Sequence, residues 1–167
     1  MTDPLLVGVD VHRKCLAQNL LSETGSEVGT RFTDDNNLPG TRAFVDKVAA
    51  EIAEEGFDEI QIAAEATGWY WWHFFLALDQ DPFLNQMPVA LYPLNPRLTA
   101  NFKRTYRDLD KTDAIDAFVI ADRLRLGRDL PKSFAFNEPY MVLRFLTRHR
   151  FHLVREKAYF LAHLYLK

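Results

Sequence analysis

The sequence predicts an α/β fold in which a mixed five-stranded sheet is flanked by helices and followed by a C-terminal helical arm. Three observations support this prediction: three short strand-like segments follow one another at the N-terminus, helix-like and strand-like segments then alternate, and a long final helix runs without a breaker. The resulting element order is βββαβαβ, followed by further helices. Such an order is typical of domains in which helices cover a sheet.

The first three predicted strands are short and separated by polar turns. Residues 5–11 (LLVGVDV) and 15–21 are apolar runs on either side of a polar break at residues 12–14, which indicates a hairpin. After the turn cluster SETGS, residues 27–33 alternate polar and apolar side chains, as expected of a half-exposed third strand. The chain is therefore expected to open with three antiparallel strands.

Helices and strands alternate in the middle of the chain. An apolar stripe over residues 38–55 ends at Gly56, a common helix C-cap, and predicts the first helix. Two prolines within residues 93–96 mark a turn. The other predicted elements are strands at 59–64 and 88–91 and helices at 68–78, 97–106 and 112–126.

The last segment, from residue 138 onwards, is helix-like without a breaker. Apolar residues recur there at seven-residue spacing, which indicates a coiled-coil arm and a homo-oligomer contact, although Arg150 and Lys157 interrupt the complementary seam. The recurring residues are Leu146, Leu153 and Phe160. We expect one domain over residues 1–135 and the start of a helical coiled-coil segment over residues 136–167, so that the chain forms the front part of a longer protein.

The composition narrows the class of protein. With 167 residues, 48% of them hydrophobic, the chain is long enough to bury the core of one domain. A single Cys excludes an internal disulfide, and no paired Cys and His spacing offers a zinc site. Because the sequence has neither a signal-peptide pattern nor a membrane-spanning apolar run, the protein is expected to be soluble and cytoplasmic.

Charge is distributed unevenly along the chain. Residues 1–96 carry a net charge of −10 and residues 97–167 a net charge of +7, although the whole chain carries only −3. A basic second half indicates an anionic partner such as a nucleic acid. Helix faces rich in Arg are also common on ordinary solvated surfaces, and charge alone leaves both interpretations open.

The helix predicted at residues 112–126 carries two acids on the face that should be buried. At the helical repeat, one stripe contains Asp113, Asp116, Ala117, Ile120 and Leu124. Asp122 points to the opposite side. Like charges one turn apart on a buried face are costly, and a divalent cation would remove that cost. Alternatively, Thr112 caps the helix, Asp113 interacts with the helix dipole and Asp116 emerges at a frayed edge.

Two further acids lie on predicted strands. Asp10 interrupts the apolar run of the first strand, and Glu65 follows the fourth strand before a Thr-Gly turn. Together with Asp113 and Asp116 they could bind two Mg²⁺ or Mn²⁺ ions, since hard cations take oxygen ligands and paired ions assist phosphoryl transfer. Each acid by itself could also be a strand-end residue that faces water.

Basic and aromatic side chains near these acids have two interpretations each. Four basic residues could hold phosphates near the metals or could be solvated: Lys103, Arg104, Arg107 and Lys111. The aromatic run at residues 69–75 could stack bases, but most of it is expected to pack a helix on the sheet or form an oligomer contact. The five His residues show no ligand spacing with the acids.

Four motifs together resemble a known family: VGVDVHRK, AAEATGWY, LNPR and KTDAIDAFVIADRLR. Over nearly the whole chain they are similar to the N-terminal domain of the DEDD transposases of the insertion-sequence 110 family, the Piv/MooV-like recombinases. The resemblance implies an RNase H-like (RuvC-type) fold and assigns its four acidic positions to Asp10, Glu65, Asp113 and Asp116. It also implies DNA as substrate, a guide RNA encoded by the element, and a C-terminal domain with a serine nucleophile beyond this chain.

Three functions are left open by the sequence. The first is a transposase or recombinase catalytic domain that cleaves and transfers DNA strands with metal ions. The second is a RuvC-like structure-selective nuclease, and the third is a non-catalytic module that binds nucleic acid and dimerises. The four acids weigh against the third, and the apolar positions of the terminal helix weigh against a stand-alone nuclease. Complete recombination is not expected from this chain alone.

Overall fold

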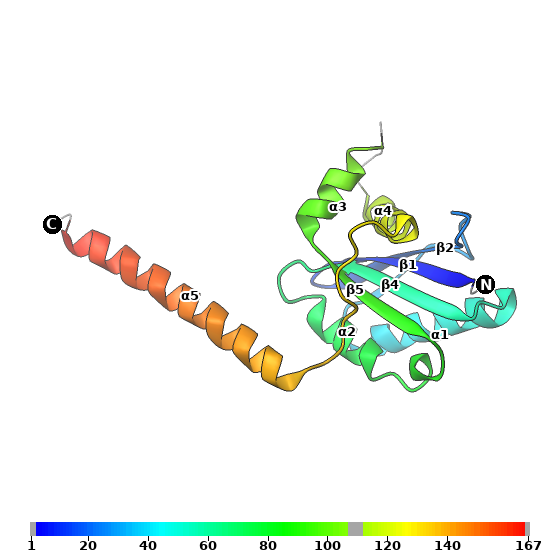
Figure 1. Cartoon of the computed structure of the whole chain (residues 1–167), viewed down its shortest axis with the longest axis horizontal. Helices are drawn as coiled ribbons and strands as arrows, with labels where there is room; N and C mark the ends of the chain where they lie inside the picture. Colours follow the sequence, from blue (N-terminus) through cyan, green and yellow to red (C-terminus); the bar gives the residue numbers. More distant parts are fainter. Residues whose placement is uncertain (1–2, 107–111, 166–167) are drawn as a thin grey trace. The chain divides into compact units, whose positions relative to one another are not determined.

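The computed structural model describes residues 3–106 and 112–165 of the chain. Two compact units are present, Met1–Ala135 and Phe136–Lys167 (Figure 1). The first unit contains a five-stranded sheet with its flanking helices, and the second contains the long helix α5 (Glu138–Tyr165). The predicted mixed sheet, flanking helices and long C-terminal helix are thereby confirmed.

The first unit has the predicted element order. Its elements are β1 (Pro4–Val11), β2 (Cys15–Leu21), β3 (Phe32–Asp35), α1 (Leu38–Glu55), β4 (Glu59–Glu65), α2 (Trp72–Asp79), the short 3-10 helix η1 (Leu84–Gln86), β5 (Val89–Leu94), α3 (Pro96–Lys103) and α4 (Asp113–Leu126). The bounds of α1 match the prediction because Asn37 accepts a hydrogen bond from the Gly40 N–H (2.8 Å) and Gly56 ends the helix with φ of 82°. Thr112 and Gly127 cap α4 in the same way.

The five strands form one mixed sheet in the order β3-β2-β1-β4-β5. β1 pairs antiparallel with β2, and β2 with β3, as predicted for the opening of the chain. β1 and β4 are parallel, as are β4 and β5. Because parallel neighbours end at the same edge of a sheet, the carboxyl ends of β1, β4 and β5 lie along one edge.

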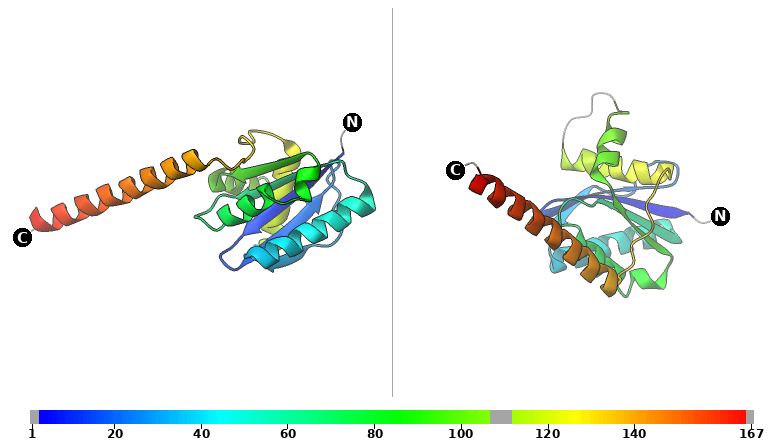
Figure 2. Two further views of the ribbon diagram at one scale, coloured as in Figure 1. Left: turned by 90° about the horizontal axis from the view of Figure 1, so that it is seen from below. Right: turned by 60° about the vertical axis from the view of Figure 1, so that its left-hand side comes forward.

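Helices cover both faces of the sheet, with α1 and α2 on one side and α4 on the other (Figures 1 and 2). Side chains alternate along β1, so that Leu5, Val7 and Val9 join the larger core with α1 and α2. Leu6 faces the other way and packs with residues of α4, including Ile120. β1 is therefore buried on both faces, which explains its nearly continuous apolar sequence.

The third strand differs from its predicted position. It spans Phe32–Asp35 instead of residues 27–33, because Gly29 adopts φ of 60° and interrupts the extended run. Glu27 keeps only an isolated bridge to Leu21. The alternation of polar and apolar residues extends across Gly29, but the left-handed backbone of this glycine prevents a continuous strand there.

Other bounds shift by a few residues. α2 begins at Trp72 instead of residue 68, because Gly68 has φ of 59° and turns the chain before the helix. α3 ends at Lys103, earlier than predicted. β5 extends beyond the predicted residues 88–91 and includes Pro93, which an edge strand tolerates.

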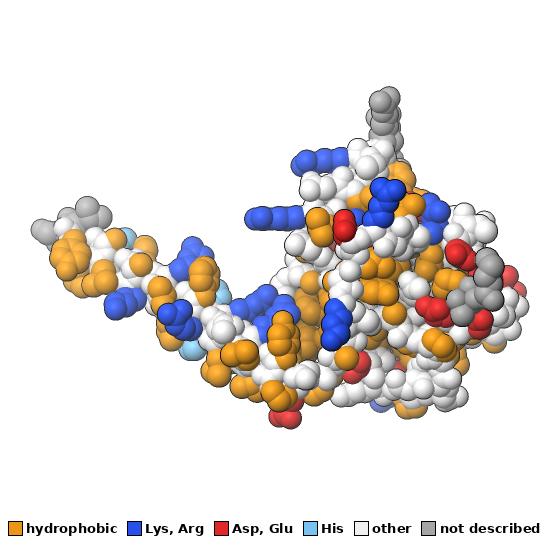
Figure 3. All heavy atoms as spheres, in the orientation of Figure 1, with side chains coloured by type: hydrophobic (Ala, Val, Ile, Leu, Met, Phe, Trp, Pro, Cys, Tyr) orange, Lys and Arg blue, Asp and Glu red, His pale blue; other side chains and the backbone are white. Residues whose placement is uncertain are grey.

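The helix α5 carries many exposed apolar side chains between its basic residues (Figure 3). None of its described residues is buried. The three residues at seven-residue spacing are exposed to solvent, with exposed fractions of 56% for Leu146, 51% for Leu153 and 63% for Phe160. Among residues 3–106 and 112–165, no helix is both long and apolar enough to cross a membrane.

α4 crosses β1 at Gly8 with almost no space between the two backbones. A β-carbon at Gly8 would lie 2.2 Å from the carbonyl oxygen of Ala117 and 2.3 Å from the nitrogen of Ala121. Both are backbone atoms, which cannot turn away as a flexible side chain could. Glycine is therefore the residue that allows α4 to pack this closely on the central strand.

We expect Gly8→Ala to lower the free energy of unfolding by about 3 kcal/mol, because α4 or β1 must shift to admit the methyl group. Gly56→Ala is the control: open space surrounds Gly56, and its left-handed backbone alone should cost about 1 kcal/mol. Urea unfolding of both variants measures the difference. Equal losses would contradict the close packing of α4 on β1.

Candidate metal centre

Two of the predicted acids lie next to each other at one edge of the sheet. Asp10 is the last but one residue of β1, and Glu65 is the last residue of β4. These parallel strands are paired in register up to Val9 with Ala64, so Asp10 and Glu65 are the next residues along the edge. Asp10 is only 9% exposed, and Glu65 is half-buried.

A third acid reaches the same place from α4. Asp116 lies next to Ala117, which is fully buried where α4 packs on the sheet. A hollow of about 340 Å³ is lined by Asp10, Glu65, Asp116 and Val119 together with the α3 residues Thr99, Ala100 and Lys103. Three of the four predicted acids therefore share one hollow.

The fourth acid, Asp113, is linked to Asp10 by a histidine that contacts both carboxylates. The Nε2 atom of His12 is 3.1 Å from Oδ2 of Asp10 and 3.3 Å from Oδ1 of Asp113. Ligand atoms of these three residues all lie within 4.8 Å of one another, a separation that a metal ion could bridge. Asp113 is more exposed than Asp10 and does not line the hollow.

His12 was missed by the sequence analysis, which found no ligand spacing between the His residues and the acids. A signal was nevertheless present, because residues two apart on a strand point to the same face. His12 directly follows β1 and lies two residues after Asp10. This spacing was not applied to His12, because residues 12–14 were interpreted as a turn after the first strand.

Burial and neighbouring charges disfavour the ionisation of Asp10 and Glu65. Burial raises the pKa of Asp10 above its ordinary value, and the charges of Asp116 and Asp113 raise it further against the opposing effect of His12. Burial likewise raises the pKa of Glu65, and the charges of Asp10 and Asp116 raise it further. A divalent cation among these carboxylates would favour their ionised forms, so the set of donors fits a hard metal ion.

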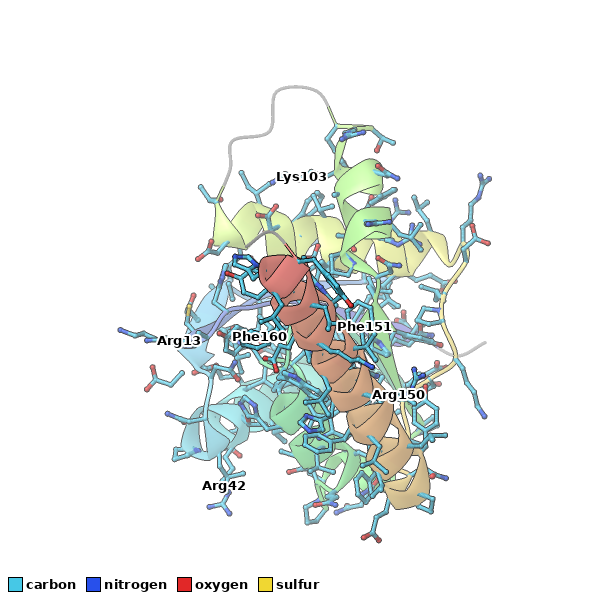
Figure 4. All side chains as sticks on the ribbon, turned by 90° about the vertical axis from the view of Figure 1, so that its left-hand side faces the viewer. Arg13, Arg42, Lys103, Arg150, Phe151 and Phe160 are labelled. Carbon is cyan, nitrogen blue, oxygen red and sulfur yellow. The ribbon has the colours of Figure 1, made fainter. Side chains whose placement is uncertain are left out.

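One predicted phosphate-binding residue contacts the acids directly. Lys103, at the end of α3, faces α4, where its Nζ atom forms an ion pair with Oδ1 of Asp116 (Figure 4). Arg104 follows it and is exposed. The other two predicted residues, Arg107 and Lys111, lie outside the described residues. Lys103 is therefore placed where it could neutralise an acid or contact a phosphate at the hollow.

Most of the aromatic run packs inside the domain. Trp71 and Phe75 are buried and form edge-to-face contacts with Phe134, which follows α4. The Phe134 N–H also donates to the Leu91 carbonyl oxygen (2.7 Å), so the aromatic cluster fixes this segment against β5. These residues therefore pack inside the domain, as most of the run was expected to do. Trp69 differs because it is 44% exposed.

Asp122, on the side of α4 away from the stripe of acids, has a structural role. It is buried and accepts hydrogen bonds from the Tyr106 hydroxyl and from Nε of Arg125, the latter at 2.6 Å. Burial and the hydrogen bond to Asp122 raise the pKa of Tyr106 well above its usual range. This network ties the residues after α3 to α4 and supports Lys103 near Asp116.

Comparison with known families decides the class of protein. A family model described as transposase, that of the insertion-sequence 110 DEDD transposases, matches residues 7–164. The chain belongs to this transposase family. No curated protein matches this transposase.

Membership agrees with the architecture of the transposase. The five-stranded mixed sheet, its flanking helices and the long C-terminal helix are those of the RNase H-like fold of the family. Because the family is one of transposases, the substrate class is DNA, and the processes are DNA transposition and recombination. The cluster of Asp10, His12 and Asp113 is compatible with binding of a divalent metal by this transposase.

We expect Glu65→Gln to raise the melting temperature of the metal-free transposase by about 1–4 °C at pH 7.5. Because folding raises the pKa of Glu65, its ionisation destabilises the fold once the pH exceeds the unfolded pKa. The glutamine removes this cost, and the difference should vanish near pH 4, at about the pKa of an unperturbed Glu.

Thermal unfolding of the two proteins from pH 4 to pH 8 measures this effect, with Glu54→Gln as control. Glu54 is exposed on α1, so its substitution should leave the melting temperature unchanged. A lower melting temperature for Glu65→Gln at pH 7.5 would show that the carboxylate stabilises the metal-free fold, contrary to our account.

Proposed function

We propose that this chain is the catalytic domain of a DNA transposase that cleaves and transfers strands with two divalent metal ions, Mg²⁺ or Mn²⁺. The proposed metal ligands and catalytic residues are Asp10, Glu65, Asp113 and Asp116. The observation that supports this most is the convergence of acids from β1, β4 and α4 at one edge of the sheet. Asp10 lies between the other three, facing the hollow and contacting His12.

The proposed chemistry divides between the metals and the protein. Bound metal ions would activate the attacking oxygen and stabilise the leaving oxygen at the phosphodiester. Asp10 would help to hold both ions, since it lines the hollow with Glu65 and Asp116 and its carboxylate lies within 4.8 Å of that of Asp113. Lys103, which pairs with Asp116, would contact a phosphate oxygen if a metal ion took over the charge of that carboxylate.

Assembly of the transposase is proposed to use α5 as a homo-oligomer contact. The exposed apolar side chains along this helix support the proposal, because such a surface is stabilised when a partner covers it. A guide RNA is proposed for the full-length protein on the ground of family resemblance. The basic second half of the sequence is compatible with contacts to both DNA and RNA.

The proposed function predicts metal-dependent nicking of supercoiled DNA that is lost when the acids are removed. We expect Asp113→Asn/Asp116→Asn to reduce nicking in Mn²⁺ by at least about 100-fold, because two ligand charges disappear. The matched control is Asp46→Asn/Glu54→Gln, which removes two exposed charges from α1. Agarose-gel conversion of supercoiled to open-circular plasmid is the readout.

Equal nicking by the variant and the unchanged chain would contradict the proposed catalytic acids. Binding of DNA with no metal-dependent nicking by any of the three proteins would favour the non-catalytic binding module. A preference for branched junctions over linear duplexes would favour a structure-selective nuclease instead.

Lys103 gives a separate prediction about DNA binding. If Lys103 contacts a phosphate in the presence of metal, Lys103→Gln should make the negative slope of log K for DNA binding against log salt shallower by about 1. The reason is that binding then releases one counterion fewer. Fluorescence anisotropy with a labelled duplex at several salt concentrations measures the slope. The control is Lys47→Gln, since Lys47 on α1 pairs with Asp34. An unchanged slope for Lys103→Gln would restrict Lys103 to its ion pair.

A further inference from the structure

His12 is held in a fixed position between two of the proposed metal ligands. Its Nε2 atom lies 3.1 Å from Asp10 and 3.3 Å from Asp113, and both distances are to carboxylate oxygens. The His12 backbone N–H donates to the Cys15 carbonyl oxygen at 2.9 Å. Nδ2 of Asn36 donates to the His12 carbonyl oxygen at 2.7 Å. The turn after β1 thus fixes the histidine's backbone from both sides.

Two of the three separations between the donor atoms are close to that of neighbouring ligands around one metal ion. Two ligand atoms at right angles, each about 2.1 Å from an octahedral ion, are about 3.0 Å apart. The two separations from Nε2, 3.1 and 3.3 Å, are close to this value, so an ion could bind after small side-chain rotations. His12 thereby contacts acids from both β1 and α4, the elements that supply three of the four proposed metal ligands.

We propose that His12 is itself a metal ligand and completes, with Asp10 and Asp113, a position of mixed nitrogen and oxygen donors. This inference rests on the metal centre proposed above. The second position, among Asp10, Glu65 and Asp116, has oxygen donors and faces Lys103. The two positions therefore differ in chemistry, although they share Asp10.

The difference in donors sets a difference in metal preference. Imidazole nitrogen suits transition metals such as Mn²⁺ and Zn²⁺, whereas Mg²⁺ prefers oxygen ligands. The position with His12 should therefore favour Mn²⁺ over Mg²⁺, and the oxygen position should accept either. Loss of His12 should weaken Mn²⁺ binding more than Mg²⁺ binding.

Pulsed electron paramagnetic resonance of the Mn²⁺-loaded chain tests the inference directly. A ligand nitrogen produces an echo modulation, and we expect this modulation in the unchanged chain. It should disappear in His12→Gln and persist in His73→Gln, a control that removes an exposed histidine on α2. Calorimetry on the same proteins should show at least about tenfold weaker Mn²⁺ binding in His12→Gln, with a smaller loss for Mg²⁺.

The outcomes separate this inference from the proposed function. Mn²⁺ bound without nitrogen modulation, or bound equally well by His12→Gln, would show that the imidazole only bridges the acids until a metal displaces it. That result would overturn the role of His12 and leave the acidic metal centre standing. Absence of Mn²⁺ binding to the unchanged chain would overturn both.

Discussion

The contact of α4 with β1 at Gly8 is the constraint on which the rest of the site depends. Two backbones approach there at a distance that excludes even a methyl group. This approach fixes the depth of α4 on the sheet and brings Asp113 and Asp116 toward Asp10. The parallel pairing of β1 with β4 places the fourth acid, Glu65, next to Asp10. The site is therefore a consequence of packing.

Ionisation of two of these acids, Asp10 and Glu65, destabilises the fold that brings them together. Burial and mutual repulsion raise the pKa values of Asp10 and Glu65, while Lys103 and His12 act in the opposite direction. Such local instability is common at functional sites, where the surrounding core holds unfavourable groups in place. The buried cluster of apolar residues between the sheet and α1 and α2 provides that support. Binding of the proposed metal ions would accordingly stabilise the folded transposase.

Much of this arrangement could be predicted from residue patterns, because each pattern reflects a local rule. The bounds of α1 follow from its cap and Gly56. The edge shared by Asp10 and Glu65 depends on the parallel pairing of β1 with β4, which residue patterns alone did not specify. The third strand was misplaced because alternation ignores the backbone of Gly29. His12 was missed because residues 12–14 were interpreted as a turn, and Asp113, one of its two partners, lies far away in the sequence. The hydrogen bond between Tyr106 and the buried Asp122 was not predicted because Tyr106 precedes Asp122 by many residues.

Direct measurement of metal binding tests the central claim, that carboxylates from three elements form one divalent metal centre. Isothermal calorimetry with Mg²⁺ and Mn²⁺ should detect binding to the unchanged chain and to Asp46→Asn/Glu54→Gln. It should detect none in Asp113→Asn/Asp116→Asn, because two of the four acids are then neutral. Equal binding by all three proteins, or no binding to the unchanged chain, would contradict the account.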